Sequence, residues 1–373
     1  MKATQLLHAI GQSIWLDSVS RDLLTSGTLQ RYCAEYAVTG LTTNPSIYEQ
    51  AITSTTAYDD AIAKKFTDGK SSASLFVELA LEDLTQAAAI FSEVHQASGG
   101  IDGWVSLEIS PLLANDTPAT IAEAKRLHAL ANCPNLLIKV PGNVSGIPAI
   151  EELIFAGVPI NVTLLFSREQ YVMAADAYWR GIQRRIEAGL DPKIGSVASV
   201  FVSRWDKAAL ESNQQLVNSR LGLAMASRIY KTSCERLASA GWLKLTNAGA
   251  IPQRVLWAST GPKKTRMPDT YYVDALASPD TIITIPESTL LAFADHGKVL
   301  SLMQDDGVAA EFILAGFSRE GMSGEETAAR LQLEGIKSFT DSWRNLLSVI
   351  ESKRPLSSLT AEPQPSLLPE SII

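Results

Sequence analysis

Short apolar runs rich in β-branched residues alternate along this chain with segments of helical periodicity, and this alternation strongly constrains the fold. Several runs lack polar alternation, which is typical of strands covered on both faces. Eight strands that alternate with helices favour an α/β fold of the closed (β/α)8 or TIM barrel type over an open sheet. The runs cover residues 13–17, 36–43, 103–109, 135–141, 159–166, 196–203, 254–260 and 281–287.

Capping signals mark several of the intervening helices. Ser167 and Gln170 form a capping box that predicts the start of a helix ending near Gly189. Ser323 and Glu326 form a second box, which opens a helical pattern that continues to about residue 352.

Two further segments between strands are expected to be helical. Residues 145–157 predict a shorter helix closed at Gly157. We expect two helices in the long segment between the second and third strands. These additions make the expected architecture a barrel with extra helices.

The last 21 residues differ from the rest of the chain. Residues 353–373 contain four prolines and show no periodicity. Such a segment predicts a proline-rich C-terminal tail, either disordered or laid along the surface. We therefore expect residues 1–352 to form a single barrel domain and residues 353–373 to follow it as a tail.

Composition and charge exclude several classes of function. The net charge is −8 with a pI near 5.2 and no basic cluster, which argues against a nucleic-acid partner. The apolar stretches are shorter than the ~20 residues that a membrane span needs, so no membrane association is expected. The N-terminal residues lack the pattern of a signal peptide, and the three cysteines are scattered. A cytoplasmic protein fits these features, as a monomer or a homodimer.

Polar residues occur where several predicted strands run into their following loops. In a (β/α)8 barrel these positions form the C-terminal mouth, where catalytic groups lie. The candidates are Asp17, Asn44, Glu108, Lys139, Asn161, Thr163, Ser199, Arg204, Ser259 and Lys263.

Lys139 is the most informative of these candidates, because it lies within the aliphatic run NLLIKVPG. Burial among aliphatic side chains favours the neutral amine, which can attack a ketone. The resulting iminium withdraws electrons and allows an adjacent C–C bond to break. One carboxylate would then take a proton from the hydroxyl that becomes a carbonyl, and a second would move protons during dehydration. Asp17 and Glu108 are available for these roles.

Each candidate also has a purely structural interpretation. Lys139 could form an ion pair with Asp17 or Glu108, and Asp17 could cap a helix. Asn44 precedes a proline, as turn residues often do. Asn161 and Thr163 could be polar fillers of a barrel layer. Arg204 and Lys263 could be solvated loop cations.

The chain resembles the transaldolases from Ile14 to about Ile350. The stretches that carry the resemblance are WLDSVSRDLLTSG, VTGLTTNPSIYEQAI, VSLEIS, LIKVPGNVSGIPAIEEL, GVPINVTLLFS, ASVFVSRWD, LWASTGPKK and LLAFADHG. The resemblance implies a (β/α)8 barrel that transfers a dihydroxyacetone unit between sugar phosphates, without a cofactor or a metal. By motif, Lys139 would form the Schiff base, Asp17 would act as acid and base, and Glu108 would act through a water held by Thr163.

The same resemblance implies a set of substrate-binding residues. Asn44 and Asn161 would hold hydroxyls of the three-carbon unit, Ser199 would contact the substrate, and Arg204 would bind phosphate. The family commonly has SPFVGR where this chain has SVFVSR. It often has a second phosphate-binding arginine after the AS dipeptide of the seventh strand. Here that dipeptide ends in Ser259, and Lys263 is the expected cation.

Three rival functions share some of these features. A fructose-6-phosphate aldolase-like lyase would release the three-carbon unit, but those relatives are shorter and typically carry glutamine and tyrosine where this chain has Glu108 and Phe201. A pyridoxal-phosphate enzyme also uses a strand lysine and would be yellow. A non-catalytic phosphate-binding barrel would not need Asp17, Glu108 and Lys139 together.

Overall fold

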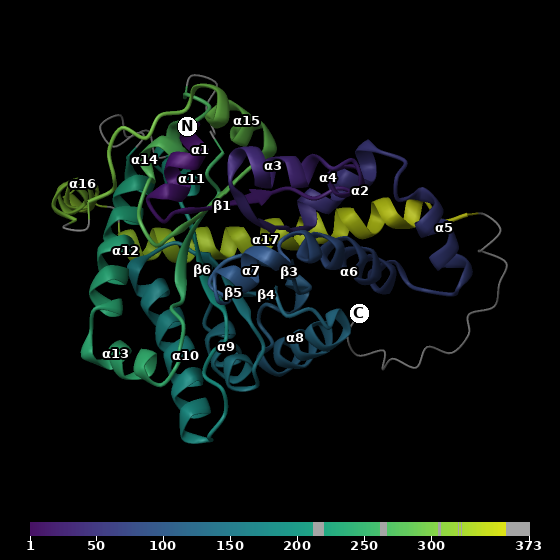
Figure 1. Ribbon diagram of the computed structural model, residues 1–373, viewed down its shortest axis with the longest axis horizontal. Helices are drawn as coiled ribbons and strands as arrows, with labels where there is room; N and C mark the ends of the chain where they lie inside the picture. Colours follow the sequence, from purple (N-terminus) through teal and green to yellow (C-terminus); the bar gives the residue numbers. More distant parts are fainter. Residues whose placement is uncertain (212–219, 262–266, 305–306, 320, 322, 356–373) are drawn as a thin grey trace.

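A computed structural model of the chain describes residues 1–211, 220–261, 267–304, 307–319, 321 and 323–355. In this part of the chain, eight parallel strands close into a barrel in chain order, with β8 pairing back to β1 (Figure 1). The predicted fold class is therefore confirmed, and every strand lies within a predicted run. The strands are β1 (Ser13–Asp17), β2 (Val38–Thr42), β3 (Val105–Glu108), β4 (Leu136–Pro141), β5 (Ile160–Leu165), β6 (Ser196–Phe201), β7 (Arg254–Ala258) and β8 (Ile282–Ile285).

Burial on both faces explains why the strands are continuous apolar runs. Every residue of β2 to β8 is buried, because inward side chains fill the barrel and outward ones contact the surrounding helices. The helices around the strands are α1 (Ala3–Ala9), α2 (Arg21–Thr25), α3 (Thr28–Tyr36), the 3-10 turn η1 (Pro111–Leu113), α8 (Thr117–Ala131), α9 (Gly146–Phe155), α10 (Arg168–Glu187), α11 (Ser203–Glu211), α12 (Leu221–Leu237), α13 (Ala240–Asn247), α14 (Tyr271–Ala275), α15 (Glu287–His296) and α16 (Val308–Arg319).

The segment between β2 and β3 holds four helices, so the expectation of two was wrong. They are α4 (Pro45–Ser54), α5 (Asp59–Thr67), α6 (Ser72–Ile90) and α7 (Ser92–Ala97). Gly69, at φ +78°, separates α5 from α6, and Ser71 caps the start of α6. The short loops between these helices carry weak sequence signals, and for that reason the periodicity suggested fewer elements.

The first predicted capping box is complete, and of the second the structure shows the bond to the Ser323 side chain. Ser167 and Gln170 make both hydrogen bonds of the capping box that opens α10. Ser323 accepts a hydrogen bond from the Glu326 amide and begins α17 (Gly324–Ser352). Gly157, at φ +87°, follows the last turn of α9 as predicted.

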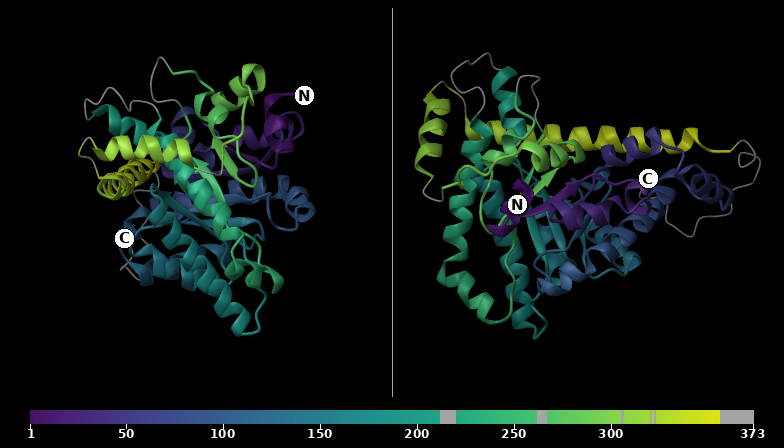
Figure 2. Two further views of the ribbon diagram at one scale, coloured as in Figure 1. Left: turned by 90° about the vertical axis from the view of Figure 1, so that its left-hand side faces the viewer. Right: turned by 45° about the horizontal axis from the view of Figure 1, so that its top comes forward.

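The long helix α17 crosses the molecule next to the barrel (Figures 1 and 2). It packs against α4 and α6. The Gln332 side chain donates hydrogen bonds to the carbonyls of Gly142 (3.2 Å) and Leu164 (2.9 Å), which lie at the C-terminal ends of β4 and β5. The helix is therefore held against the C-terminal mouth of the barrel.

The start of the predicted tail is tied to the fold. Lys353 donates a hydrogen bond to the carbonyl of Ile52 at 2.9 Å and forms an ion pair with Asp59. The rest of the tail, 356–373, lies outside the described residues, and the assignment of residues 1–352 to one domain stays a prediction. Among the helices that the structure describes, none has the length and apolar character needed to cross a bilayer.

A buried polar cluster closes the N-terminal end of the barrel. The Asp102 carboxylate accepts hydrogen bonds from the Ser13 hydroxyl and from Trp15 Nε1, the latter at 2.8 Å. Arg254 donates to the Ser13 hydroxyl at 2.9 Å and to the carbonyl of Thr281 at 2.6 Å. These groups link β1, β7 and the segment that leads into β3. They lie at the N-terminal end of the barrel, where residues usually contribute to stability.

We expect Asp102→Ala to lower the free energy of unfolding by about 3–5 kcal/mol, because the buried Arg254 guanidinium would lose the carboxylate that it pairs with across the barrel end. Chemical denaturation followed by tryptophan fluorescence measures the change. The exposed Asp68→Ala serves as control and should shift the midpoint little. Equal midpoints for the two variants would contradict the stabilising role.

Candidate active site

A cavity of about 210 Å³ opens at the C-terminal ends of the strands. Parallel strands all end at this mouth, so their last polar residues are brought together. The predicted site residues that line the cavity are Asp17, Asn44, Lys139, Thr163, Ser199, Phe201, Arg204 and Ser259.

Lys139 is the central charged group of the cavity. It lies in β4 and is only 5% exposed. Its Nζ donates a hydrogen bond to the carbonyl of Thr43 at 2.8 Å and lies 3.2 Å from Oε2 of Glu108. The ion pair with Glu108, which the sequence left as an alternative, is therefore present, and it leaves Lys139 on the cavity wall.

Glu108 lies behind Lys139 because of strand register. Glu108 in β3 is the direct neighbour of Lys139 in β4. Its carboxylate is almost fully buried, and this burial raises the pKa of Glu108 above its ordinary value. The Lys139 charge opposes the rise, and the charge of Asp17 adds to it.

Asn161 and Ser199 form a polar layer beside the lysine. Asn161 in β5 is the register neighbour of Lys139. Its side-chain amide donates to the Ser106 hydroxyl at 3.1 Å and accepts from the Ser199 hydroxyl at 2.6 Å. Thr163 lies two residues after Asn161 and points to the same side of the strand, where it lines the cavity.

Asp17 ends β1 and lines the same cavity. The N-cap of the following helix α2 is Ser20, whose side chain accepts a hydrogen bond from the Leu23 amide. The alternative in which Asp17 caps this helix was therefore wrong. Its carboxylate lies close enough to Glu108 to affect the pKa of that residue.

Asn44 has a structural role and a place in the site at once. It is the N-cap of α4, and its side-chain oxygen accepts hydrogen bonds from the amides of Ser46 and Ile47. The interpretation as local turn chemistry is therefore correct. Its side-chain nitrogen is not needed for this cap, and the residue also lines the cavity.

Arg204 places a guanidinium next to aromatic rings. It follows β6 at the start of α11, and its Cζ lies 5.1 Å from the ring centre of Phe201. Burial lowers the pKa of Arg204 from its ordinary value, and the negative charges of Glu334 and Glu108 partly offset this by raising it. The interpretation of Arg204 as a solvated loop cation is thus wrong.

The loop after β7 carries the last two predicted residues. Ser259 has a left-handed backbone at φ +56°, a conformation that is uncommon for a residue other than glycine. Its hydroxyl lies 2.9 Å from the hydroxyl of Ser203. Lys263 lies outside the described residues, so its predicted place in the site stays a prediction.

Sequence reasoning missed the contribution of α17 to the site. Ser338, Phe339 and Ser342 of this helix line the cavity together with the strand ends. Their spacing places them on one helical face. The helix begins nearly 40 residues after the last strand, so its residues do not lie at a strand end. The strand-end rule that identified the other candidates therefore could not find them.

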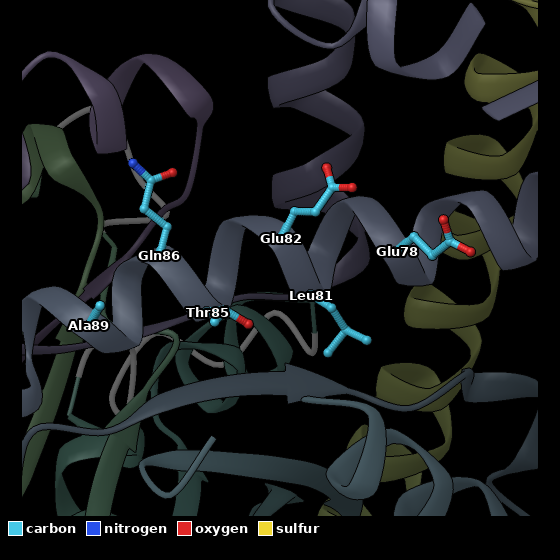
Figure 3. A pocket seen from close by; sticks show the side chains of 6 residues that line it. All are labelled: Glu78, Leu81, Glu82, Thr85, Gln86 and Ala89. Atoms are coloured by element: carbon cyan, nitrogen blue, oxygen red, sulfur yellow. The ribbon is translucent and has the colours of Figure 1, made fainter. Parts of the chain in front are cut away.

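A larger and shallower hollow of about 640 Å³ lies on the outside of α6 (Figure 3). Its six lining residues come from this one helix, with Glu82 and Gln86 pointing to one side and Leu81 to the other. Glu78 and Glu82 are already paired with lysine or arginine side chains. We place the chemistry in the smaller cavity, since it contains the buried lysine.

The described residues show no cluster of three or more His, Cys, Asp or Glu side chains that could bind a metal ion. The cavity instead brings together a primary amine, a carboxylate and a guanidinium, and a second carboxylate, that of Glu108, lies directly behind the amine. Such a set can form an imine with a carbonyl compound, move protons around it and bind an anionic group.

Comparison with known proteins gives one consistent result. Residues 14–350 match the family model described as transaldolase/fructose-6-phosphate aldolase. The chain is 43% identical to transaldolase 1 of Streptomyces avermitilis, over 91% of this chain and 92% of that protein. It is 40% identical to the transaldolase of Renibacterium salmoninarum, over 93% of this chain and 96% of that protein. With the transaldolase of Thiobacillus denitrificans it shares 38% identity over 94% of this chain and 100% of that protein.

The matched region includes β1 from its second residue, β2 to β8 and most of α17, the elements that build the cavity. This identity extends over nearly the whole chain, and it agrees with the motifs in the sequence and with the geometry of the site. The chain belongs to the transaldolase/fructose-6-phosphate aldolase family.

Proposed function

We propose that this protein is a transaldolase that works through a Schiff base on Lys139. It moves a dihydroxyacetone unit from a ketose phosphate, fructose 6-phosphate or sedoheptulose 7-phosphate, to an aldose phosphate, erythrose 4-phosphate or glyceraldehyde 3-phosphate. This reaction belongs to the non-oxidative pentose phosphate pathway. The observation that carries the proposal is the buried Lys139 amine, which lies 3.2 Å from Glu108 in a cavity that Asp17 also lines.

Lys139 and Asp17 divide the chemistry of bond cleavage. The unprotonated amine attacks the ketone carbon, and loss of water from the carbinolamine gives an iminium. Asp17 takes the proton of the hydroxyl on the second carbon from the iminium, and the bond between the first and second carbons breaks. The second carbon becomes the aldehyde, and the electron pair of the broken bond is held as an enamine on Lys139. The aldose leaves, and the acceptor aldehyde enters and reverses these steps.

Glu108 and Thr163 serve the formation and dehydration of the carbinolamine. Oε2 of Glu108 and Oγ1 of Thr163 are buried, and neither makes a hydrogen bond with good geometry among the described residues. Buried polar atoms are almost always satisfied, so both atoms are suited to share a water or a hydroxyl of the intermediate. Burial raises the pKa of Glu108, which makes its carboxyl a better proton acceptor than an exposed glutamate.

The remaining residues bind the substrate. Asn44, Asn161 and Ser199 present amide and hydroxyl groups to the three-carbon unit. Arg204 binds the phosphate, and its planar guanidinium can contact two phosphate oxygens. Ser259 contributes a hydroxyl beside it, and Lys263 supplies a second positive charge.

An aldolase that releases free dihydroxyacetone is the second candidate, because the family description covers both reactions. A tyrosine at the cavity could protonate the bound carbanion and favour release. This chain has Phe201 there, which carries no proton to give. The transferase is therefore favoured.

The setting of the protein follows from this function. Family members act on sugar phosphates, and we propose a cytoplasmic location, where such substrates are found. We further propose that the protein works as a monomer or a homodimer, without a cofactor.

The proposed function predicts turnover of fructose 6-phosphate only when erythrose 4-phosphate is present, measured by coupled detection of glyceraldehyde 3-phosphate. Borohydride added with fructose 6-phosphate alone should attach a three-carbon adduct to Lys139, seen by peptide mass spectrometry. Lys139→Met should abolish both signals. Steady turnover without acceptor would assign the aldolase instead, and an adduct on another lysine would overturn the role of Lys139.

Asp17→Ala should allow the Schiff base to form but reduce kcat by about 100-fold to 10,000-fold, because no base takes the hydroxyl proton. Borohydride would then trap the intact six-carbon sugar on Lys139 instead of the three-carbon unit. The exposed Asp22→Ala, five residues later, is the matched control. Normal turnover by Asp17→Ala would show that another group acts as the base.

Glu108 should set the acidic limb of the pH profile of kcat/KM. Because burial raises the pKa of Glu108, the midpoint should lie above the value of about 4.3 for an exposed glutamate, with activity lost as the pH falls through it. Glu108→Gln should remove this limb and lower kcat, whereas the exposed Glu187→Gln should change neither. An unchanged limb in Glu108→Gln would assign it to another group.

A further inference from the structure

Phe339 of α17 lines the cavity, and the proposed reaction assigns it no role. Its ring centre lies 5.9 Å from Nζ of Lys139 and 5.9 Å from Cζ of Arg204. The Phe201 ring centre is 6.3 Å away. The Phe339 ring therefore lies within cation–π distance of both the amine and the guanidinium.

The position of Phe339 is set by the anchoring of α17 on both sides of it. On the N-terminal side, Gly335 packs so closely that an added Cβ would lie 2.8 Å from Leu164 and 3.1 Å from Arg204. On the C-terminal side, Trp343 makes an edge contact with Phe76 of α6, with ring centres 5.2 Å apart. Gln332 adds hydrogen bonds to the strand ends.

The polar lining of the cavity comes from the strand ends, from the segments that follow them and from two serines of α17. The rings of Phe201 and Phe339 provide apolar surface beside the lysine. Apolar surface near a reacting group excludes water from it. This matters for an imine, because protonation of the enamine carbon gives an iminium that water can attack. That attack breaks the C–N bond, releases dihydroxyacetone and returns the free amine to Lys139.

We propose that Phe339 is a specificity-determining residue, which decides whether the three-carbon unit on Lys139 passes to an acceptor aldehyde or is lost to water. The inference rests on the proposed function. The ring covers the amine end of the cavity and keeps water from the imine while the acceptor binds. Phe201 supplies the second apolar wall, so that the two rings exclude water together.

The test compares two rates in Phe339→Ala. One is the release of dihydroxyacetone from fructose 6-phosphate alone, and the other is transfer to erythrose 4-phosphate. The ratio of release to transfer should rise at least about tenfold, since the cavity gains space for water next to the imine. Phe339→Leu retains an apolar side chain of smaller area and should raise the ratio less. Leu333→Ala, on the exposed face of the same helix, is the control and should leave the ratio unchanged.

The ratio distinguishes specificity from a structural role. A purely structural Phe339 would lower both rates in parallel and leave the ratio at the wild-type value in both variants, which would overturn the inference. If Phe339→Ala does not fold, the Phe339→Leu ratio decides the question alone. Absence of a borohydride adduct on Lys139 in the wild-type protein would instead refute the proposed function, so the two failures are separable.

Discussion

The buried ammonium group of Lys139 is the constraint on which the site depends. A charge inside a barrel is tolerated only when partners replace the water it has lost. Here the carbonyl of Thr43 and the carboxylate of Glu108 do so, at 2.8 Å and 3.2 Å. The register of β3 and β4 supplies the carboxylate, and the turn after β2 supplies the carbonyl. The pairing therefore offsets part of the cost of burying the charge and also delivers the proton acceptor that an amine nucleophile needs.

The two ends of the barrel satisfy their polar groups in different ways. At the N-terminal end, Arg254 donates a hydrogen bond to the Ser13 hydroxyl, which in turn donates to the Asp102 carboxylate. At the C-terminal end, the backbones of Leu164 and Ser259 adopt left-handed conformations, and the Thr163 hydroxyl is buried without a partner among the described residues. Strain and unsatisfied groups are typical of functional sites, where a ligand completes the interactions. The hydrogen bond from Gln332 helps to hold the strained Leu164 in place.

Much of the fold was predictable because burial on both faces leaves a direct pattern in the chain. Each of the eight described strands lies within a predicted apolar run, and the Ser167 cap forms as expected. The helices between β2 and β3 were undercounted, since short breaks such as that at Gly69 are weak signals. Asn44 shows a different limit, because one side chain both caps α4 and lines the cavity. A local pattern cannot separate two roles that share one residue.

The amino-acid sequence by itself determined the barrel topology and the polar residues at the strand ends, because a residue's position along a parallel strand decides which end of the barrel it reaches. The tertiary structure decided which of these groups touch. The contact of Lys139 with Glu108 depends on strand register, and Phe339 enters the cavity only through the docking of α17. Both are long-range placements, set by packing between segments far apart in the chain, for which short sequence patterns carry no signal.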